Sequence, residues 1–170
     1  SRGSVIPLFI EQIMSGKELT VTEPEMTRFL MSLNDAVELV NYAFENAYTG
    51  DIMVQKAPAC TVGNLAQALC EIFEIQPRIH IIGIRHGEKM HETLLTNEEC
   101  ARAIDHGDYY RVPADNRDLN YDNYFIKGNL KRANITEFTS ANTEQLNIEQ
   151  IKIRLLELPF IKEQLNIWRK

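Results

Sequence analysis

The sequence predicts an α/β fold, and three observations support this prediction. Segments with apolar residues at helical spacing alternate along the chain with short β-type runs, an order typical of α/β proteins. Ser, Thr and Asn residues stand at several expected helix starts. The length of 170 residues, with 44% hydrophobic and 25% charged residues, is that of a globular protein with a core of its own.

The first fifty residues are expected to form two helices with two short strands between them. Residues 5–14 have apolar side chains at helical spacing, whereas residues 19–22 and 29–31 are β-type runs. Ser32 and Asp35 have the spacing of a capping box, which predicts a helix start. The helix that follows has an apolar stripe, expected to be its buried face, made of Ala36, Val37, Val40, Ala43 and Phe44.

Strands and helices continue to alternate up to Val112. Residues 51–55 are expected to form a strand, and Thr61 to cap the next helix. Residues 79–84 predict a nearly continuous apolar strand. A capping box at Thr96 predicts a short helix, and residues 109–112 predict a last short strand.

The composition changes after Pro113, where aliphatic residues become few and asparagines frequent. This stretch is expected to be an extended arm, after which Asn147 caps two terminal helices rich in large apolar residues. The sequence thus predicts an α/β portion, an arm and C-terminal helices, at residues 1–112, 113–146 and 147–170. Such an arm favours exchange of the terminal helices between subunits of a homo-oligomer, and docking on the same chain is the alternative.

The charge balance argues against nucleic acid as a partner. The 18 Lys and Arg residues against 24 Asp and Glu residues give a net charge of −6, so an anionic ligand needs a local cationic site. The uncharged stretches are too short to span a membrane. The four histidines lack metal-ligand spacing. Three cysteines without C-x-x-C spacing predict reduced, buried thiols in a cytoplasmic protein: Cys60, Cys70 and Cys100.

The chain begins with Ser1-Arg2-Gly3-Ser4 directly before the first helix, so we expect it to start inside a larger fold. Its eight glycines form no G-x-G-x-x-G or G-x-x-x-x-G-K motif. No tyrosine is followed four residues later by the lysine that would poise it as a general base. By itself, therefore, the chain is expected to bind no dinucleotide cofactor and to be catalytically inactive.

The clearest local motif is Arg-His-Gly-Glu-Lys at residues 85–89, directly after the expected strand 79–84. Ligands of open α/β sheets bind at the carboxyl ends of strands. Arg85 offers a bidentate fork for phosphate oxygens, and Glu88 can accept bonds from a pair of hydroxyls. This combination fits a nucleotide diphosphate beside a ribose. Two alternatives stay open: a loop whose Arg and Glu pair with each other or lie on a solvated face, and a histidine phosphatase in which His86 accepts the phosphate.

Arg28 is the second cationic candidate. The strand before it carries Thr20 and Thr22, whose hydroxyls and edge backbone groups can pair with a planar base. The alternative is a surface arginine at a strand edge.

Six motifs follow one another along the chain: Arg2-Gly3-Ser4-Val5-Ile6-Pro7, Met26-Thr27-Arg28-Phe29, Arg85-His86-Gly87-Glu88-Lys89, Glu92-Thr93-Leu94-Leu95, Asp118-Leu119-Asn120-Tyr121 and Asn142-Thr143-Glu144. In this order they resemble the C-terminal part of bacterial nucleotide-sugar 4,6-dehydratases. These enzymes form the capsular-polysaccharide branch of the extended short-chain dehydrogenase/reductases, and many carry the label UDP-glucose 4-epimerase. The resemblance covers nearly the whole chain.

The resemblance implies a role for each candidate residue. Arg28 and Arg85 would contact the UDP diphosphate, and Glu88 would hold the uridine ribose. The strand from Thr20 to Thr22 would present its backbone to uracil. The fold implied is the substrate-binding part of an incomplete Rossmann-type fold, with NAD(P) bound mainly by a part upstream of Ser1.

The resemblance also implies a reaction on UDP-N-acetylglucosamine or a related UDP-sugar. The sugar is oxidised at C4 with NAD(P), water is lost across C5 and C6, and hydride returns at C6. An epimerase would instead return the hydride to C4 on the other face. A UDP-glucose 4-epimerase and a non-catalytic oligomerisation module are the alternatives.

Overall fold

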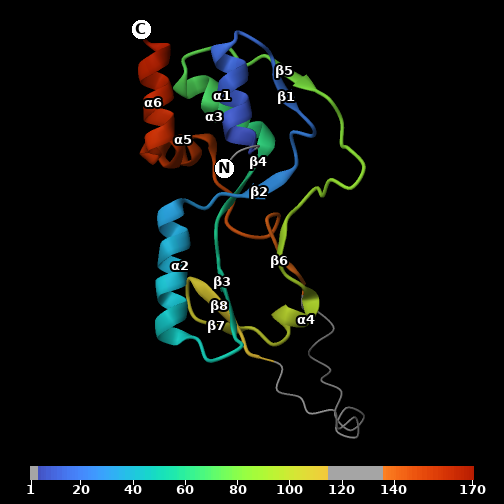
Figure 1. Ribbon diagram of the computed structural model, residues 1–170. Coiled ribbons are helices and arrows are strands. Elements are labelled where there is room, and N and C mark those ends of the chain that lie inside the picture. Colours follow the sequence, from blue (N-terminus) through green and yellow to red (C-terminus); the bar gives the residue numbers. More distant parts are fainter. Residues whose placement is uncertain (1–3, 115–135) are drawn as a thin grey trace, which may run out of the picture.

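The computed structural model describes residues 4–114 and 136–170 and confirms a mixed α/β fold (Figure 1). Helices and short strands alternate up to Val112, and two helices end the chain. In chain order the elements are α1 (Val5–Met14), β1 (Leu19–Val21), β2 (Thr27–Phe29), α2 (Leu33–Asn46), β3 (Ile52–Gln55), β4 (Ala59–Thr61), α3 (Val62–Ile72), β5 (Ile79–Ile81), β6 (Thr93–Leu95), α4 (Asn97–Cys100), β7 (Ile104–Asp105), β8 (Tyr109–Val112), β9 (Phe138–Thr139), α5 (Ile148–Glu157) and α6 (Pro159–Trp168).

The described strands form four small sheets rather than one continuous sheet. β1 pairs with β5 in parallel, and β2 pairs with β4 antiparallel. A three-stranded antiparallel sheet has the order β3-β8-β7, and β6 pairs with β9. The strands that sequence analysis missed are β4, β6, β7 and β9. Each has only two or three residues, too few to show a period-2 pattern.

The main core lies where α1, α3, α5 and α6 pack together, at one end of the molecule beside β1 and β5 (Figure 1). Phe9 and Ile13 of α1 and Leu69 and Phe73 of the α3 segment are buried there. A second, smaller cluster holds the sheet β3-β8-β7 at the other end, and only Val54, Leu95 and Val112 are buried in it. The pair β2-β4 lies between the two ends (Figure 1).

The C-terminal helices dock on the body of their own chain. Ile151, Leu155, Ile161 and Leu165 are buried in the same core as α1 and α3. The indole Nε1 of Trp168 donates a hydrogen bond of 3.1 Å to the carbonyl of Phe73. The expectation that these helices are exchanged between subunits is therefore corrected for their buried face, which docks in cis, while Ile153, Phe160 and Ile167 stay exposed. A homo-oligomer stays a prediction.

Two other expectations need correction. The stripe on α2 was expected to be buried, yet Val37, Val40 and Phe44 are exposed. The predicted strand 79–84 is shorter: β5 ends at Ile81, and its residues are exposed, since β1 is its one partner strand within the described chain. The capping box at Ser32 and the cap at Thr61 are confirmed, as are those at Thr96 and Asn147.

Part of the predicted arm is described, and it is tied to the body. Thr139 of β9 pairs with Thr93 of β6, and the buried Leu146 donates its amide proton to the carbonyl of Ala59. The boundaries at 113 and 147 stay a prediction. No helix in the described ranges is both long and apolar enough to cross a membrane.

Candidate functional site

Arg28 of β2 is held against the segment that follows the Arg85–Lys89 motif. Its Nη2 donates to the carbonyl of Lys89 at 3.0 Å, and its Nη1 donates to the carbonyl of Met90 at 3.2 Å. Nη1 also donates to the carbonyl of Thr27 at 2.7 Å, and Nε lies 3.4 Å from a carboxylate oxygen of Glu92. The structure thus brings together two motifs that lie about sixty residues apart in the sequence.

The Arg85–Lys89 motif forms a tight turn that its own glutamate closes. The carboxylate of Glu88 accepts the backbone N–H of Arg85 at 3.0 Å, and the N–H of Glu88 donates to the carbonyl of Arg85 at 3.1 Å. Gly87 has φ +86°, a left-handed conformation that glycine adopts without strain. The side chains of Arg85 and Glu88 are not paired with each other in this turn, so of the first alternative only the solvated loop is left.

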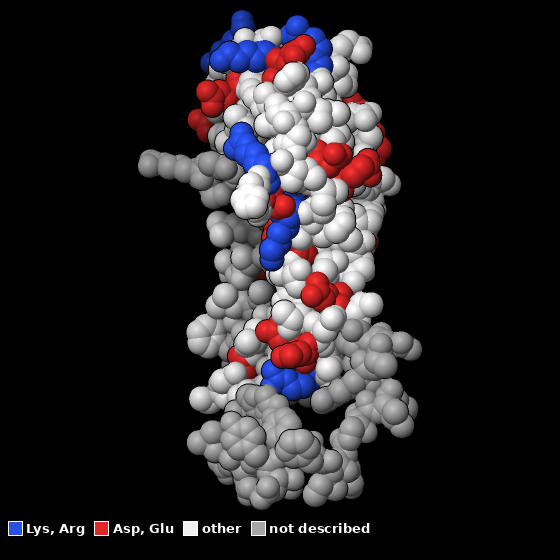
Figure 2. All heavy atoms as spheres, turned by 90° about the vertical axis from the view of Figure 1, so that its right-hand side faces the viewer, with Lys and Arg blue, Asp and Glu red and all other residues white. Residues whose placement is uncertain are grey.

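The turn presents two exposed cations, Arg85 and Lys89, and Arg85 is the one whose planar guanidinium can bind phosphate oxygens in pairs. The residue is exposed, and within residues 4–114 and 136–170 its side chain has no hydrogen-bond or ion-pair partner. Figure 2 shows the face to which this loop belongs, with Lys and Arg side chains beside Asp and Glu side chains along its middle. The chain has a net charge of −6, so an anionic ligand can bind only where positive charge is present locally, and Arg85 supplies such a charge on this mixed surface.

A buried polar network behind Arg28 was missed by sequence analysis. Ser140, which is fully buried, donates to the carbonyl of Thr27 at 3.1 Å and accepts the backbone N–H of Glu92 at 2.8 Å. The hydroxyl of Thr27 lies 2.6 Å from Ser140 Oγ and 2.8 Å from His91 Nδ1. No local signal could have placed Ser140 here, because it lies 113 residues from Thr27.

Ser140 Oγ is the centre of this network, because it accepts the Glu92 amide and contacts both the carbonyl and the hydroxyl of Thr27. Either hydroxyl can donate in the contact between Thr27 and Ser140, and Nδ1 of His91 donates to or accepts from Thr27 according to its tautomer. His91 and Glu92 are therefore fixed at the point where the Arg85–Lys89 turn rejoins the body.

Thr20 and Thr22 are less open than expected. The backbone N–H of Thr20 donates to Oε1 of Gln12 at 3.1 Å, and its hydroxyl accepts a bond from Nε2 of Gln12 at 2.8 Å. The amide of this edge strand is therefore taken by α1 and is not free for a base. The hydroxyl of Thr22 contacts the sulfur of Met26 at 3.4 Å, and Met26 in turn lies 3.5 Å from Nη2 of Arg28.

Neither the cysteines nor the other histidines supply a nucleophile to this region. All three cysteines are free, Cys60 and Cys70 being buried and Cys100 half-buried. Cys60 lies opposite Arg28 in the β2-β4 register, and burial raises the pKa of its thiol to about 11. It is therefore protonated at neutral pH. His91 and His106 bond to Thr27 and Tyr42, which gives no support to a phosphatase built on His86.

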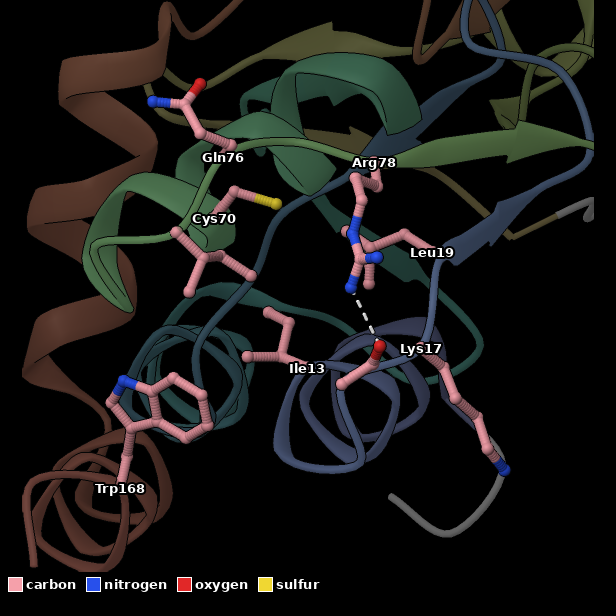
Figure 3. Close-up of a pocket in the computed structure, with 9 residues that line it drawn as sticks. Ile13, Lys17, Leu19, Cys70, Gln76, Arg78 and Trp168 are labelled. Carbon is pink, nitrogen blue, oxygen red and sulfur yellow. Dashed lines mark hydrogen bonds between the residues drawn. The ribbon is translucent and has the colours of Figure 1, made fainter.

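A separate pocket of about 320 Å³ opens at the amino ends of β1 and β5 (Figure 3). Ile13, Leu19 and Trp168 line it, and Arg78 reaches across to donate from Nη2 to the carbonyl of Gly16 at 2.8 Å. The candidate residues follow the carboxyl ends of the same two strands, where ligands of parallel strands bind. This pocket is therefore distinct from the candidate site.

The described residues contain no glycine-rich turn of the kind that holds a dinucleotide cofactor. Such a cofactor needs a glycine-rich turn between a strand and the amino end of a helix, where free N–H groups meet the pyrophosphate. At the junction of β4 and α3, Thr61 occupies that position itself and accepts the N–H of Asn64 at 3.1 Å. No group of His, Cys, Asp and Glu residues suited to a metal ion is found in the described ranges either. The motif at residues 118–121 lies outside the described residues.

Comparisons with known proteins point to one family. The family profile described as "Polysaccharide biosynthesis protein" matches residues 1–114, and the profile described as "Polysaccharide biosynthesis protein C-terminal" matches residues 115–162. A protein of Rickettsia massiliae (strain Mtu5) named "UDP-glucose 4-epimerase" is 58% identical over 165 residues, which are 97% of this chain and 48% of the relative. A protein of the same name from Rickettsia canadensis (strain McKiel) matches equally well.

A solved structure shows the same fold. The X-ray structure of Pen from Bacillus thuringiensis has a TM-score of 0.73 with 31% sequence identity, over 93% of this chain and 46% of that chain. The chain thus spans about half the length of the relatives and of the solved structure that it matches.

Proposed function

Because the chain belongs to the polysaccharide biosynthesis protein family, we propose that it is the UDP-sugar-binding, C-terminal portion of an NAD(P)-dependent nucleotide-sugar enzyme. The preferred activity is a UDP-N-acetylglucosamine 4,6-dehydratase for capsule or surface polysaccharide. The fold agrees with the C-terminal portion of an extended short-chain dehydrogenase/reductase, and the other half of such an enzyme would bind the cofactor. Free cysteines support a cytoplasmic location.

The observation that carries the proposal is the contact between Arg28 and the Arg85–Lys89 turn. The Nη1 and Nη2 groups of Arg28 make four hydrogen bonds, to three carbonyls and the Met26 sulfur, and its Nε forms an ion pair of 3.4 Å with the Glu92 carboxylate. We therefore assign Arg28 chiefly to positioning the turn. Arg85, whose guanidinium is exposed, is assigned to the diphosphate.

Glu88 fits the ribose in the same arrangement. One of its carboxylate oxygens accepts the Arg85 amide, and the other is left to accept a hydroxyl. Thr22 stays in the proposal as a contact to the base through its hydroxyl. Thr20 contributes less than the sequence suggested, because its amide and hydroxyl are bonded to Gln12.

Isothermal titration of the chain with UDP tests the proposal. Replacing Arg85→Ala should weaken UDP binding about tenfold or more, since a charge-assisted bond to phosphate contributes about 1.5 to 3 kcal/mol. Lys162→Ala removes one positive charge from the exposed face of α6 and is the matched control, with affinity unchanged. Uridine without phosphate should bind the Arg85→Ala variant and the unaltered chain alike.

Arg28→Ala should also weaken UDP binding, but with a second effect that Arg85→Ala lacks. Because Arg28 holds the turn through Lys89 and Met90, its removal should lower the free energy of unfolding as well. UDP binding that is equal in Arg85→Ala and the unaltered chain would contradict the assignment of Arg85 to the diphosphate, and equal binding in Arg28→Ala would contradict the role of Arg28 in positioning the turn.

A UDP-glucose 4-epimerase is the second candidate, favoured by the name that the Rickettsia relatives carry. The product separates the two activities: a dehydratase gives a 4-keto-6-deoxy sugar, whereas an epimerase gives the C4 epimer with every oxygen retained. The assay belongs on a full-length protein of the family that carries this chain as its C-terminal part. A non-catalytic assembly module would bind no UDP in the titration above.

A further inference from the structure

Helix α2 has an apolar face that the described chain leaves uncovered. Leu33, Val37, Val40 and Phe44 have the i, i+4, i+7, i+11 spacing of one helix face, and they are 79%, 51%, 52% and 86% exposed. No residue of α2 is fully buried. A single exposed apolar residue is ordinary, but four in one stripe are typical of a surface that contacts another protein surface. These four residues are called the α2 face below.

The other side of α2 already packs on the sheet β3-β8-β7. Tyr42 stacks on Tyr109, with ring centroids 4.0 Å apart, and its hydroxyl lies 3.1 Å from Nδ1 of His106. A helix with apolar residues on two sides belongs between two layers of a larger protein. In Figure 1 the described chain supplies one of these layers, on the side of α2 where β7 and β8 lie.

The sheet beside α2 is also short of apolar cover. Ile52 of β3 and Ile104 of β7 are both about half exposed, at 52% and 45%. The described chain thus leaves further apolar side chains exposed at the end of the molecule that holds α2. By contrast, the end that holds α1, α3, α5 and α6 has a continuous core of its own.

Two findings indicate what covers the α2 face. The chain matches only 48% of its relatives' length, so a part of domain size precedes or surrounds the matched region in them. The match to a C-terminal family profile places that part ahead of the matched region. In addition, Ile6 of α1 lines the same small pocket as Ser32 and Asp35 at the start of α2. A polypeptide joined ahead of α1 would therefore enter beside α2.

We propose that the α2 face binds the preceding half of the family chain, as found in the Rickettsia relatives. The inference rests on the proposed function in one respect: the proposed function assigns cofactor binding to this preceding half. The contact is formed by apolar packing, and Val37 and Phe44 are the two residues of the α2 face chosen to test it. A second copy of this chain is the other possible occupant. The closeness of α1 to the start of α2 favours the preceding half instead, because only that half would be joined to α1.

Thiol labelling tests the proposal. Single cysteines replace Val37, Phe44 or the control residue Ile153, which is 62% exposed on α5, in a Cys100→Ser background. Each is made twice, in the 170-residue chain and in a chimera that joins this chain to the preceding half of the Rickettsia massiliae relative. Maleimide should label all three positions rapidly in the short chain. In the chimera, positions 37 and 44 should react at least about tenfold more slowly, and position 153 equally fast.

Equal labelling of positions 37 and 44 in both proteins would overturn the proposal. So would protection in the short chain that rises with its concentration, since this would make a second copy the occupant. If the chimera does not fold, co-production of the two halves as separate chains decides instead. Co-purification should then be lost with Val37→Asp plus Phe44→Asp and kept with Ile153→Asp, and any other pattern contradicts the proposal. UDP titration is independent of both readouts, so failure of the proposed function is seen separately.

Discussion

At the residue scale, the candidate site depends on contacts that span most of the chain. Arg28 belongs to β2, the turn that it holds lies about sixty residues later, and Ser140 closes the network from the C-terminal part. Sequence analysis identified Arg28, Arg85 and Glu88 because each lies in a motif beside a strand. It could not identify Ser140, because a buried serine between loops has no local pattern.

Ser140→Ala should lower the free energy of unfolding by about 1 to 3 kcal/mol, because it removes the hydrogen bonds of Ser140 to the Thr27 carbonyl, the Thr27 hydroxyl and the Glu92 amide. Urea denaturation followed by circular dichroism measures this. Ser15→Ala is the matched control, since Ser15 is exposed at the end of α1, and it should change stability by less than about 0.5 kcal/mol. Equal stability of the two variants would contradict the network as described.

Asp51 is a second residue whose surroundings have a measurable consequence. The N–H of Tyr48 donates to one carboxylate oxygen and the N–H of Ala114 to the other, and Nε of Arg111 lies 2.7 Å away. The hydrogen bond from Tyr48 contributes most, and together these groups hold the pKa of Asp51 below its ordinary value. The folded protein therefore binds this proton less tightly than the unfolded chain does.

The stabilisation from Asp51 should be fully present above the ordinary aspartate pKa of about 4 and should be lost as the pH falls through the lower, folded value. Asp51→Asn should thus destabilise the protein at neutral pH and have a smaller effect near pH 3. Urea denaturation over this pH range measures both. Asp108→Asn, on an exposed carboxylate between β7 and β8, is the control. If the loss of unfolding free energy in Asp51→Asn does not change with pH, the charge of Asp51 plays no part in its contribution to stability.

At the element scale, helix starts were predictable and short strands were not. The caps at Ser32, Thr61, Thr96 and Asn147 follow from local hydrogen bonding, which needs only three or four neighbouring residues. The two-residue strand β9 depends on pairing with the distant β6, and β7, which pairs with the neighbouring β8, is too short to show a period-2 pattern. The apolar stripe of α2 was recognised correctly, but periodicity shows only that a face is apolar and does not show what covers it.

Alanine substitutions of two phenylalanines, one on a covered and one on an uncovered helix face, should differ in their effect on stability. Phe9→Ala on α1 should cost about 3 to 5 kcal/mol in the 170-residue chain, because Phe9 is fully buried. Phe44→Ala on α2 should change stability by less than about 0.5 kcal/mol, because that side chain is 86% exposed. Both are read from urea denaturation. A large loss in Phe44→Ala would mean that the α2 face is already buried in this chain.

At the scale of the whole molecule, the candidate site lies between a well-packed end and a poorly covered one. The four helices α1, α3, α5 and α6 give the upper end its core, and β2 carries Arg28 between this core and the sheet beside α2 (Figure 1). The α/β class was predictable from the alternation of elements. The docking site of the terminal helices was not predictable from the sequence. The same sequence allows an arm to return to its own chain or to reach a second copy.

The central claim is that UDP binds at Arg85, in the turn that Arg28 holds at the carboxyl ends of β1 and β5. The most direct measurement is a titration of the ¹⁵N-labelled chain with UDP, followed by amide and arginine side-chain shifts in two-dimensional NMR. The account predicts that the shifts are confined to Thr22–Arg28 and Arg85–Glu92, with Arg85 Nε–H moving most. Shifts centred instead on Ile13, Arg78 and Trp168, which line the pocket at the amino ends of the same strands, or no shifts at all, would contradict it.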